Sequence, residues 1–335
     1  MTSEWAWTGR VDGTDPEHLR WHQVVTPYLP GGDPGACVFV GFASDEGVRR
    51  NKGRVGAASG PDALRRALSP MALPAPLRAF DAGTITVTDR RLEEGQRHLG
   101  TTVSALLDAG AFPVVFGGGH EVAYGSYLGL ANSTVAASRG MAAPSTAPSR
   151  SKPTVGILNL DAHFDLRPDL LPSSGTPFRQ ILEADDTVRY AVIGISQPSN
   201  TADLFDTAHR LGVRYLLDDD CDPARVTTFV DEFLAGLDLL HLTVDLDVLP
   251  AAIAPGVSAP AAYGVAPAVI QSVCDRVTAS GKLATADIAE LNPVFDIDHR
   301  TARTAARLVH RLVTRHENVA GQPFRSSGST HRSRR

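Results

Sequence analysis

Short apolar runs alternate with stretches of helical periodicity along most of the chain. The runs are rich in β-branched and aromatic residues and predict strands over residues 36–41, 113–116, 154–160, 190–195, 213–217, 239–244 and 283–289. The intervening stretches predict helices over residues 62–68, 90–109, 176–183, 201–211, 223–235, 267–279 and 300–314, with another after residue 121. Strands that are apolar at nearly every position are typical of a parallel sheet covered on both faces. The pattern therefore predicts an α/β fold with about seven or eight strands.

Three segments depart from this alternation. Residues 1–35 are polar, rich in Pro and Gly and without a clear period, which predicts an irregular N-terminal segment on the surface. Residues 131–153 are rich in Ser, Ala and Pro and predict a flexible insertion. Because both flanks of this insertion resemble strand ends of one sheet, we expect residues 36–316 to form a single domain. Residues 317–335 are polar and basic and predict a disordered tail.

The composition is that of an ordinary globular protein and narrows the range of partners. Of the 335 residues, 43% are hydrophobic, and 32 basic against 37 acidic residues give a net charge of −5. This charge does not favour a nucleic-acid partner. We see no signal-peptide pattern and no apolar run near the roughly 18–20 residues of a membrane helix. Cys37, Cys221 and Cys274 are far apart and odd in number, so we expect free thiols and a cytoplasmic location.

The end of the predicted strand at residues 154–160 carries the first candidate chemistry. Asp161, His163 and Asp165 follow it at every second position. Because side chains alternate along a strand, a strand end would direct these three groups to one side. Converging carboxylates and imidazole are what a divalent metal ion needs. Taken alone, the stretch is equally consistent with polar residues that end a strand and begin a turn.

Three further predicted strands are followed by residues of the same kinds. His120 follows three glycines, Asp245 and Asp247 lie two positions apart, and Glu290 follows the last of the runs. Each also has a simpler interpretation: an anion-binding turn for His120, solvated turn carboxylates for the aspartates and a strand-end cap for Glu290. The carboxyl ends of parallel strands meet at one edge of a sheet, where ligands bind. We therefore expect these side chains to join the Asp-His-Asp stretch in one crevice.

Together these side chains predict a site for two divalent cations. Gathered carboxylates without cations would repel one another and raise their own pKa values. The donors are too many for one zinc ion, include no thiolate and are mostly carboxylates, which favours Mn²⁺ over Zn²⁺. Fe²⁺ and Co²⁺ would also suit this donor set. The predicted ligands are His120, Asp161, His163, Asp165, Asp245 and Asp247.

The four strand-end blocks resemble the ureohydrolases, a family that includes arginases, agmatinases and formimidoylglutamases. The resemblance rests on Gly118-Gly-His120, Asp161-Ala-His-Phe-Asp165, Thr243-Val-Asp-Leu-Asp247 with the following Ala254-Pro-Gly256, and Asp287-Ile-Ala-Glu-Leu-Asn-Pro293. The blocks follow the order of the family and cover nearly the whole chain. The resemblance implies a three-layer α/β/α sandwich with a mostly parallel sheet of about eight strands. It also implies two Mn²⁺ ions per subunit and a homo-oligomer.

Details within these blocks resemble formimidoylglutamases more than arginases. Gly119-His120-Glu121 stands where arginases often have Asp-His-Ser. No His lies between Asp165 and His209, so the proton-shuttling His of arginases is missing. The stretch Asn51-Lys-Gly-Arg54 is similar to the Asn-x-Gly-Arg of the formimidoylglutamase branch.

The resemblance implies a dimanganese hydrolase that cleaves the formimidoyl C–N bond of N-formimidoyl-L-glutamate, giving L-glutamate and formamide in histidine degradation. Glu290 would hold the planar, cationic amidinium of this small-molecule substrate. Asp165 would donate a proton to the leaving amine. Bridging or terminal metal ligands would be His120, Asp161, Asp165 and Asp245 or Asp247, with His163 on the second ion.

The carboxylates of such a substrate need cations or hydrogen-bond donors from the loops. The candidates are Asn51, Arg54, Ser174, Thr176 and Arg179. For either arginine, a solvated loop charge is an equally good interpretation.

Three other functions compete with this one. An agmatinase or another guanidino hydrolase would share the metal site and release urea. A catalytically silent metal-binding relative would not need to keep all of the ligands and Glu290. A deacetylase on a related fold uses one Zn²⁺ and would leave His120 and Asp247 without a role.

Overall fold

The computed structural model describes residues 5–31, 34–138 and 153–316. Nine strands form one sheet in the order β1-β3-β2-β4-β9-β8-β5-β6-β7, and every pairing between neighbours is parallel. The strands are β1 (Thr26–Pro27), β2 (Cys37–Ala43), β3 (Ala79–Thr86), β4 (Phe112–Phe116), β5 (Val155–Leu160), β6 (Arg189–Ile195), β7 (Arg214–Leu217), β8 (Leu239–Asp245) and β9 (Leu283–Ala289). The predicted α/β fold with a parallel sheet is confirmed.

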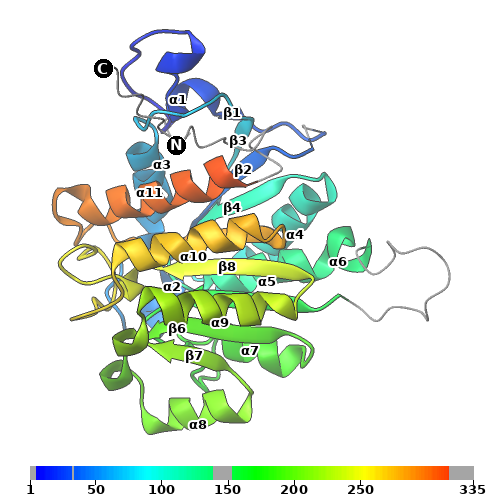
Figure 1. Cartoon of the computed structure of the whole chain (residues 1–335), viewed down its shortest axis with the longest axis vertical. Helices are drawn as coiled ribbons and strands as arrows, with labels where there is room; N and C mark the ends of the chain where they lie inside the picture. Colours follow the sequence, from blue (N-terminus) through cyan, green and yellow to red (C-terminus); the bar gives the residue numbers. More distant parts are fainter. Residues whose placement is uncertain (1–4, 32–33, 139–152, 317–335) are drawn as a thin grey trace, which may run out of the picture.

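Helices cover both faces of this sheet and complete the three-layer sandwich (Figure 1). In Figure 1, α9, α10 and α11 lie in front of the sheet and α4, α5 and α7 lie behind it. The helices are α1 (Trp21–Val24), α2 (Glu46–Arg50), α3 (Gly60–Leu68), α4 (Leu92–Asp108), α5 (Val122–Asn132), α6 (Thr134–Ser138), α7 (Pro177–Ala184), α8 (Ala202–Arg210), α9 (Pro223–Ala235), α10 (Pro267–Ala279) and α11 (Arg300–Arg315). Proline occupies the first turn of α3, α7, α9 and α10, where its missing N–H leaves no helical bond unmade.

The central strands are buried because alternate side chains enter different cores. On β5, Leu158 and Leu160 pack with α9, α10 and α11 in one core, whereas Ile157 packs with α7 and α8 in another. Every residue of β5 and β8 is buried, as expected for parallel strands between two helical layers. This arrangement holds the strand ends rigidly in place.

Two strands, β1 and β3, were not predicted. Strand β1 contains only Thr26 and Pro27, too short a run to give a periodic signal. Strand β3 lies near the edge of the sheet, and its second half is largely exposed, so it lacks the continuous apolar run that marked the central strands. The expected count of about eight strands is therefore nine.

The N-terminal segment does more than cover the surface, which corrects the expectation for residues 1–35. The side chain of Trp21 is fully buried and that of Trp7 is 3% exposed. Both rings pack on Phe39 of β2, with centroids 5.6 Å and 5.2 Å away. The Trp7 indole also donates to Asp81 Oδ2 (2.6 Å), which accepts from Arg65 Nε (2.7 Å). The segment therefore closes the core at the β2–β3 side, which its composition did not indicate.

Part of the predicted insertion at residues 131–153 is helical. Helix α5 extends to Asn132, and α6 spans Thr134–Ser138. Residues 139–152 and the predicted tail at 317–335 lie outside the described residues. Within the described ranges, none of the helices combines the length and apolar character needed to span a bilayer.

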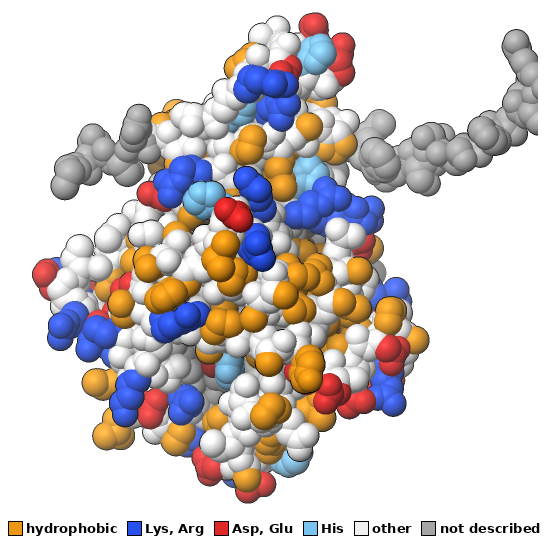
Figure 2. Space-filling view, turned by 90° about the vertical axis from the view of Figure 1, so that its left-hand side faces the viewer, with side chains coloured by type: hydrophobic (Ala, Val, Ile, Leu, Met, Phe, Trp, Pro, Cys, Tyr) orange, Lys and Arg blue, Asp and Glu red, His pale blue; other side chains and the backbone are white. Residues whose placement is uncertain are grey.

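The loops that follow the strands lie on one side of the molecule, at the left of Figure 1. Figure 2 views the molecule from that side, and hydrophobic side chains gather across the middle of this face. The predicted polar clusters follow β4, β9, β8 and β5, which are consecutive neighbours in the sheet. Strand order therefore brings these clusters together.

His310 on α11 makes the stability of the fold sensitive to acid. Burial lowers the pKa of His310 from its usual 6.5 to about 4, with help from Arg307 and Arg311. Its Nδ1 accepts a hydrogen bond from the buried Trp21 Nε1 at 3.1 Å, which protonation of Nδ1 would remove. Between pH 6.5 and about 4 the unfolded chain binds a proton that the native chain does not, so the free energy of unfolding should fall with falling pH.

Urea unfolding of wild type and His310→Gln across that pH range measures this contribution. Glutamine can accept from Trp21 but does not titrate, so its stability curve should fall less steeply toward acid. Parallel curves for the two proteins would contradict the assignment to His310.

Candidate metal centre

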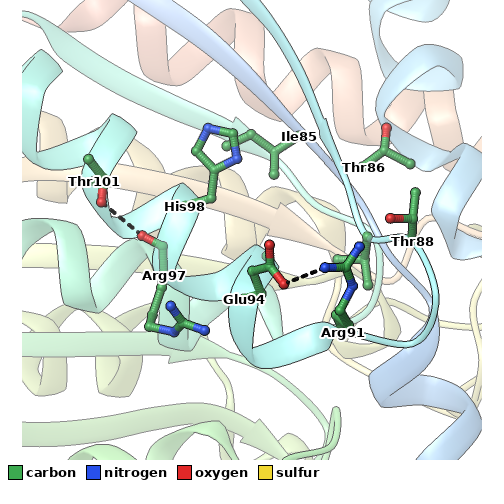
Figure 3. A pocket seen from close by; sticks show the side chains of 10 residues that line it. Ile85, Thr86, Thr88, Arg91, Glu94, Arg97, His98 and Thr101 are labelled. Atoms are coloured by element: carbon green, nitrogen blue, oxygen red, sulfur yellow. Dashed lines mark hydrogen bonds and ion pairs between the residues drawn. The ribbon is translucent and has the colours of Figure 1, made fainter.

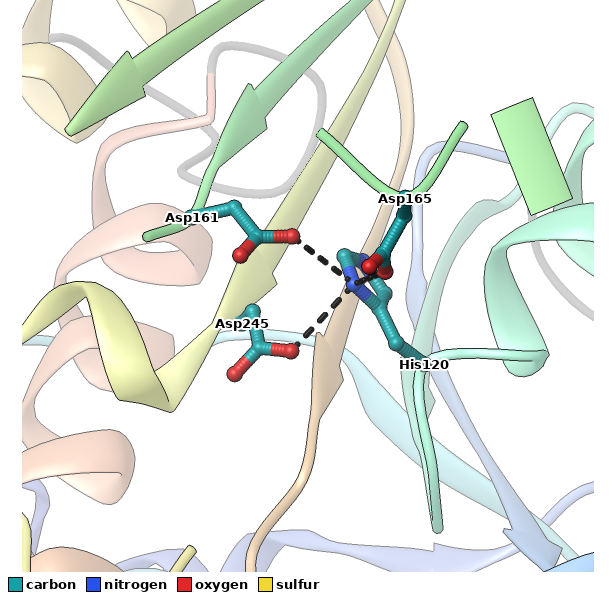
Figure 4. Close-up of side chains that lie close together, drawn as sticks. All are labelled: His120, Asp161, Asp165 and Asp245. Atoms are coloured by element: carbon teal, nitrogen blue, oxygen red, sulfur yellow. Dashed lines mark ion pairs between the residues drawn. The ribbon is translucent and has the colours of Figure 1, made fainter. Parts of the chain in front are cut away.

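Four side chains from three strand ends point toward one another at the centre of the sheet edge (Figure 4). His120 Nδ1 lies 3.1 Å from Asp161 Oδ2, 2.9 Å from Asp165 Oδ2 and 3.3 Å from Asp245 Oδ2. Three of the four are almost completely removed from solvent. These donors come from the ends of β4, β5 and β8, as the parallel topology predicts.

A second donor group shares Asp161 with the first. His163 Nδ1 lies 3.0 Å from Asp247 Oδ2 and 3.5 Å from Asp161 Oδ1. Asp161 therefore presents Oδ2 to the first group and Oδ1 to the second. Within each group the donor atoms all lie within 4.8 Å of one another. The structure brings all of the predicted metal ligands together as two adjoining sets with Asp161 between them.

The buried carboxylates of this cluster repel one another, and bound cations would remove that repulsion. Burial raises the pKa of Asp245 well above its usual range, and the neighbouring Asp247 and Asp161 raise it further. Burial, followed by the charge of Asp161, also raises the pKa of Asp165 to about 6. Two ionised carboxylates at such separations repel by about 3–4 kcal/mol at an effective dielectric constant of about 20. Divalent cations among them would replace this repulsion with attraction.

The surroundings of His120 Nδ1 show that this cluster suits a metal ion. This buried nitrogen makes no hydrogen bond in the described structure, although three carboxylate oxygens lie within 3.3 Å of it. A lone pair facing carboxylates is repulsive unless a cation or a proton lies between them. The donor set, carboxylate oxygens with imidazole nitrogen and no thiolate, suits a hard divalent metal such as Mn²⁺.

A buried relay behind His120 determines which ring nitrogen carries hydrogen. His120 Nε2 lies 2.9 Å from Thr243 Oγ1, and the Thr243 hydroxyl donates to Asp287 Oδ1. Asp287 Oδ2 in turn lies 2.6 Å from His241 Nε2. Because the only hydroxyl hydrogen of Thr243 is committed to Asp287, Nε2 of His120 must be the donor, and in the neutral imidazole Nδ1 then offers its lone pair. Thr243 and Asp287 are direct partners across β8 and β9, a relation that the sequence alone did not indicate.

Two residues of the site hold unusual backbone angles. Asp165 has a φ of 51° and Glu290 a φ of 68°, in the left-handed region that residues other than Gly rarely adopt. The Glu290 N–H donates to Gly118 O at 2.7 Å, and Glu290 Oε1 accepts from the His120 N–H at 3.0 Å. Strain of this kind concentrates at functional sites. Burial, and then the charge of Glu121, raises the pKa of Glu290 to about 8.

A cavity of about 320 Å³ opens over these groups and is lined by Asp165, Asp245, Asp247 and Glu290, among others. It is large enough for a small organic molecule. Of the predicted substrate contacts, Asn51, Arg54 and Ser174 line the cavity. The Asn51 amide donates to Ser174 Oγ at 3.1 Å, which joins two loops of its wall.

Arg54 is occupied by the protein itself. Its Nε donates to Ser258 O at 3.0 Å, another guanidinium nitrogen donates to Val257 O, and its Cζ lies 4.1 Å from the centre of the Phe295 ring. Two of its five N–H groups therefore fasten two loops together. The protein thus holds the guanidinium in place at the cavity wall.

The structure places Thr176 and Arg179 away from the cavity wall. Thr176 is buried, and its hydroxyl is within hydrogen-bond distance of Ser173 O and Gln180 Oε1 at the start of α7. Arg179 lies on α7, where its Nε donates to Glu183 Oε1 at 2.8 Å. Their position in the same sequence block as Ser174 suggested a shared role, but the start of a helix directs them elsewhere.

The chain is similar to known proteins over most of its length. A model of the arginase family matches residues 35–314. A formimidoylglutamase of Nocardia farcinica is 70% identical over 314 residues, which cover 93% of this chain and 97% of that protein. A formimidoylglutamase of Rhodococcus jostii is 65% identical, and the matched region covers 94% of this chain and 96% of that protein.

Solved structures show the same fold. The formiminoglutamase of Trypanosoma cruzi, solved with Mn²⁺₂, is 28% identical and superposes with a TM-score of 0.71. The superposition covers 82% of this chain and 91% of that chain. A formimidoylglutamase of Bacillus subtilis, 20% identical, superposes with a TM-score of 0.76 over 90% of this chain and 93% of its own.

Asp161→Ala should abolish manganese retention and turnover, because Asp161 is the residue that the two donor groups have in common within the described ranges. Metal content after dialysis and turnover measure both effects. Asp218→Ala is the matched control, since Asp218 directly follows β7 at the same sheet edge but belongs to neither group. An Asp161→Ala protein that kept its ions and full activity would show that the donor assignment is wrong.

Thr243→Val should lower manganese affinity by about 10- to 100-fold through His120, as loss of a group that orients a ligand typically does. Thr243→Ser should restore the affinity because it keeps the hydroxyl. Thr285→Val is the matched control: this buried Thr on β9 donates to Pro113 O and is outside the relay. Competition against a chelator measures all three variants, and an unchanged affinity in Thr243→Val would rule out the relay.

Proposed function

The chain belongs to the arginase family, and we propose that it is a metal-dependent hydrolase that acts on N-formimidoyl-L-glutamate. The reaction adds water across the formimidoyl C–N bond and yields L-glutamate and formamide. The observation that carries this proposal is the complete double donor set around Asp161 in a chain 70% identical to a formimidoylglutamase.

The ligand roles follow from the two donor groups. His120, Asp161, Asp165 and Asp245 would hold one Mn²⁺ ion, and Asp161, His163 and Asp247 would hold the other. When bound, the ions supply an activated water for attack at neutral pH and stabilise developing negative charge. The carboxylates of the chain set the net charge of the site, and the relay through Thr243 keeps His120 in the tautomer that offers Nδ1.

Glu290 is proposed to hold the substrate's amidinium group. Its Oε2 is buried and makes no hydrogen bond in the described structure, and its side chain lines the cavity. A planar cation with N–H donors can give this oxygen a charge-assisted hydrogen bond. The strained backbone of Glu290 and the bond from His120 N–H hold the carboxylate beside the donor groups, so the reacting carbon would be oriented toward them.

The leaving amine of glutamate needs a proton when the C–N bond breaks. Asp165 is proposed to deliver it, because its carboxyl group lines the cavity next to the cluster. A donor within hydrogen-bond reach of the leaving nitrogen avoids expulsion of an unprotonated amine. Asn51 and Ser174, which line the same cavity, are proposed to contact the rest of the substrate. Family membership supports two further parts of the proposal, a homo-oligomer and a cytoplasmic location.

A substrate panel tests the proposed function directly. Manganese-loaded protein is incubated separately with N-formimidoyl-L-glutamate, agmatine, guanidinobutyrate and arginine, and formamide and urea are quantified. We expect formamide from the first compound and no urea from the others. Release of urea would indicate a guanidino hydrolase, and no product from any compound would indicate a catalytically silent relative.

The Glu290→Gln variant tests whether this carboxylate binds the amidinium group. It keeps the shape of the side chain and removes the charge, so kcat/KM for N-formimidoyl-L-glutamate should fall by about 10- to 100-fold, the effect of losing a charge-assisted hydrogen bond. Manganese content should stay at the wild-type level because Glu290 belongs to neither donor group. Unchanged kinetics would exclude Glu290 from amidinium binding.

A further inference from the structure

The lining of the cavity is divided by charge. Three of its acidic groups, Asp245, Asp247 and Glu290, are at most 4% exposed, and the Asp165 side chain is 12% exposed. Three cations also line it, Lys52, Arg54 and Arg167, and of these Lys52 and Arg167 are solvent-exposed. The cavity therefore has a buried acidic end and an exposed basic rim.

Lys52 and Arg167 differ from other cationic side chains nearby because they pair with no acidic or carbonyl group of the described residues. Arg49 and Arg50, on the adjacent helix α2, pair with Glu46 at 2.5 Å and 2.9 Å. Arg54 is engaged by backbone carbonyls. Within the part of the chain that the structure describes, the side chains of Lys52 and Arg167 make neither a hydrogen bond nor an ion pair. Two cationic groups are thus available to an anion in the cavity.

The backbone holds Lys52 in a conformation that a lysine rarely adopts. Its φ is 62°, and the turn is closed by hydrogen bonds from Lys52 N to Arg49 O (3.1 Å) and from Gly53 N to Val48 O (2.8 Å). Helix ends of this kind usually place Gly at the left-handed position. A lysine there is less favourable for the backbone than glycine, and the closed turn fixes the point from which its side chain starts.

Arg167 lies at the cavity wall, where the loop that contains Gly175 holds its backbone. Its backbone N–H donates to Gly175 O at 2.9 Å. A Cβ on Gly175 would lie 2.8 Å from Arg167 Cδ and 3.1 Å from both Arg167 Nε and Asn51 Nδ2. The absence of a side chain at Gly175 therefore lets Arg167 pass beside Asn51, the residue that precedes Lys52. Both cations reach the cavity from neighbouring parts of its rim.

We propose that Lys52 and Arg167 determine specificity by each binding one carboxylate of a dicarboxylate substrate. This inference rests on the proposed function. In N-formimidoyl-L-glutamate the amidinium nitrogen is bonded to Cα, one carboxylate is on Cα and the other ends the side chain. A cavity with a buried acidic end for the amidinium and two cations on its rim complements these charges. Agmatine has an ammonium group in place of carboxylates, and arginine has an ammonium beside its only carboxylate. The basic rim repels these groups, so it excludes guanidino substrates as well as selecting the acidic one.

Steady-state kinetics of Lys52→Met and Arg167→Met test the proposal. Each should raise KM for N-formimidoyl-L-glutamate by about 10- to 100-fold, as expected for a lost charge-assisted hydrogen bond, with kcat close to that of wild type. Such a split identifies binding that is equal in the ground and transition states. Lys52→Arg and Arg167→Lys should recover most of the affinity. Arg97→Met is the matched control, because Arg97 lines a separate groove along α4 (Figure 3).

Substrates that lack one carboxylate identify the partner of each cation. N-formimidoyl-L-glutamine lacks the side-chain carboxylate, and N-formimidoyl-γ-aminobutyrate lacks the α-carboxylate. Wild type should bind both less tightly than the diacid. Each Met variant should lose the discrimination against one of these compounds and keep it against the other.

The possible outcomes separate this proposal from the proposed function. If wild type releases formamide while both Met variants keep its KM and its discrimination, the role of Lys52 and Arg167 is refuted and the function stands. If wild type releases no formamide, both are refuted. Manganese content verifies that each variant is folded, and a Met variant that loses its ions is replaced by the Gln variant at the same position.

Discussion

Repulsion among buried carboxylates is the constraint on which the rest of this structure depends. Asp161, Asp245 and Asp247 are nearly inaccessible to solvent, and Asp161 shares one donor group with Asp245 and the other with Asp247, each with donor atoms within 4.8 Å of one another. Such a cluster would be unstable in a folded protein unless cations compensated it. The rigid sheet provides the opposing force: four neighbouring parallel strands, covered by helices on both faces, keep these groups from moving apart. The metal centre is thus a consequence of topology as much as of ligand chemistry.

Residues around the metal centre fix the orientation of the donor groups without a bound metal ion. The relay from His120 through Thr243 to Asp287 selects the imidazole tautomer, so the ring nitrogen that faces the carboxylates is a donor to metal. The left-handed backbones of Asp165 and Glu290 place two carboxylates where regular strand geometry would not. These features cost stability when considered alone. The packed core on either side of the sheet provides the stability that allows them.

Loops at the same edge carry the residues that are proposed to select the substrate. Asn51 joins the loop after α2 to the loop before α7 through Ser174, and Arg54 joins it to the segment at Val257 and Ser258. With these side chains occupied in holding the wall together, Lys52 and Arg167 are left to face the cavity. The donor groups for metal and the proposed substrate contacts therefore lie in different structural layers, the strand ends and the loops that follow them.

The sequence by itself determined the α/β class, most of the strands and helices, and the acidic and imidazole side chains that the fold brings together. It did so because buried parallel strands are continuous apolar runs and because Asp161, His163 and Asp165 directly follow one of them. Strands β1 and β3 and the buried Trp7 and Trp21 were beyond its reach, since they lack local periodicity. Only the tertiary structure decided that Asp161 is shared by two donor groups, that Thr243 and Asp287 support His120, and that Arg54 bonds to backbone carbonyls while Lys52 and Arg167 have no partner among the described residues. These relations join residues far apart in the chain, and only the register of the strands and the packing of the loops specify them.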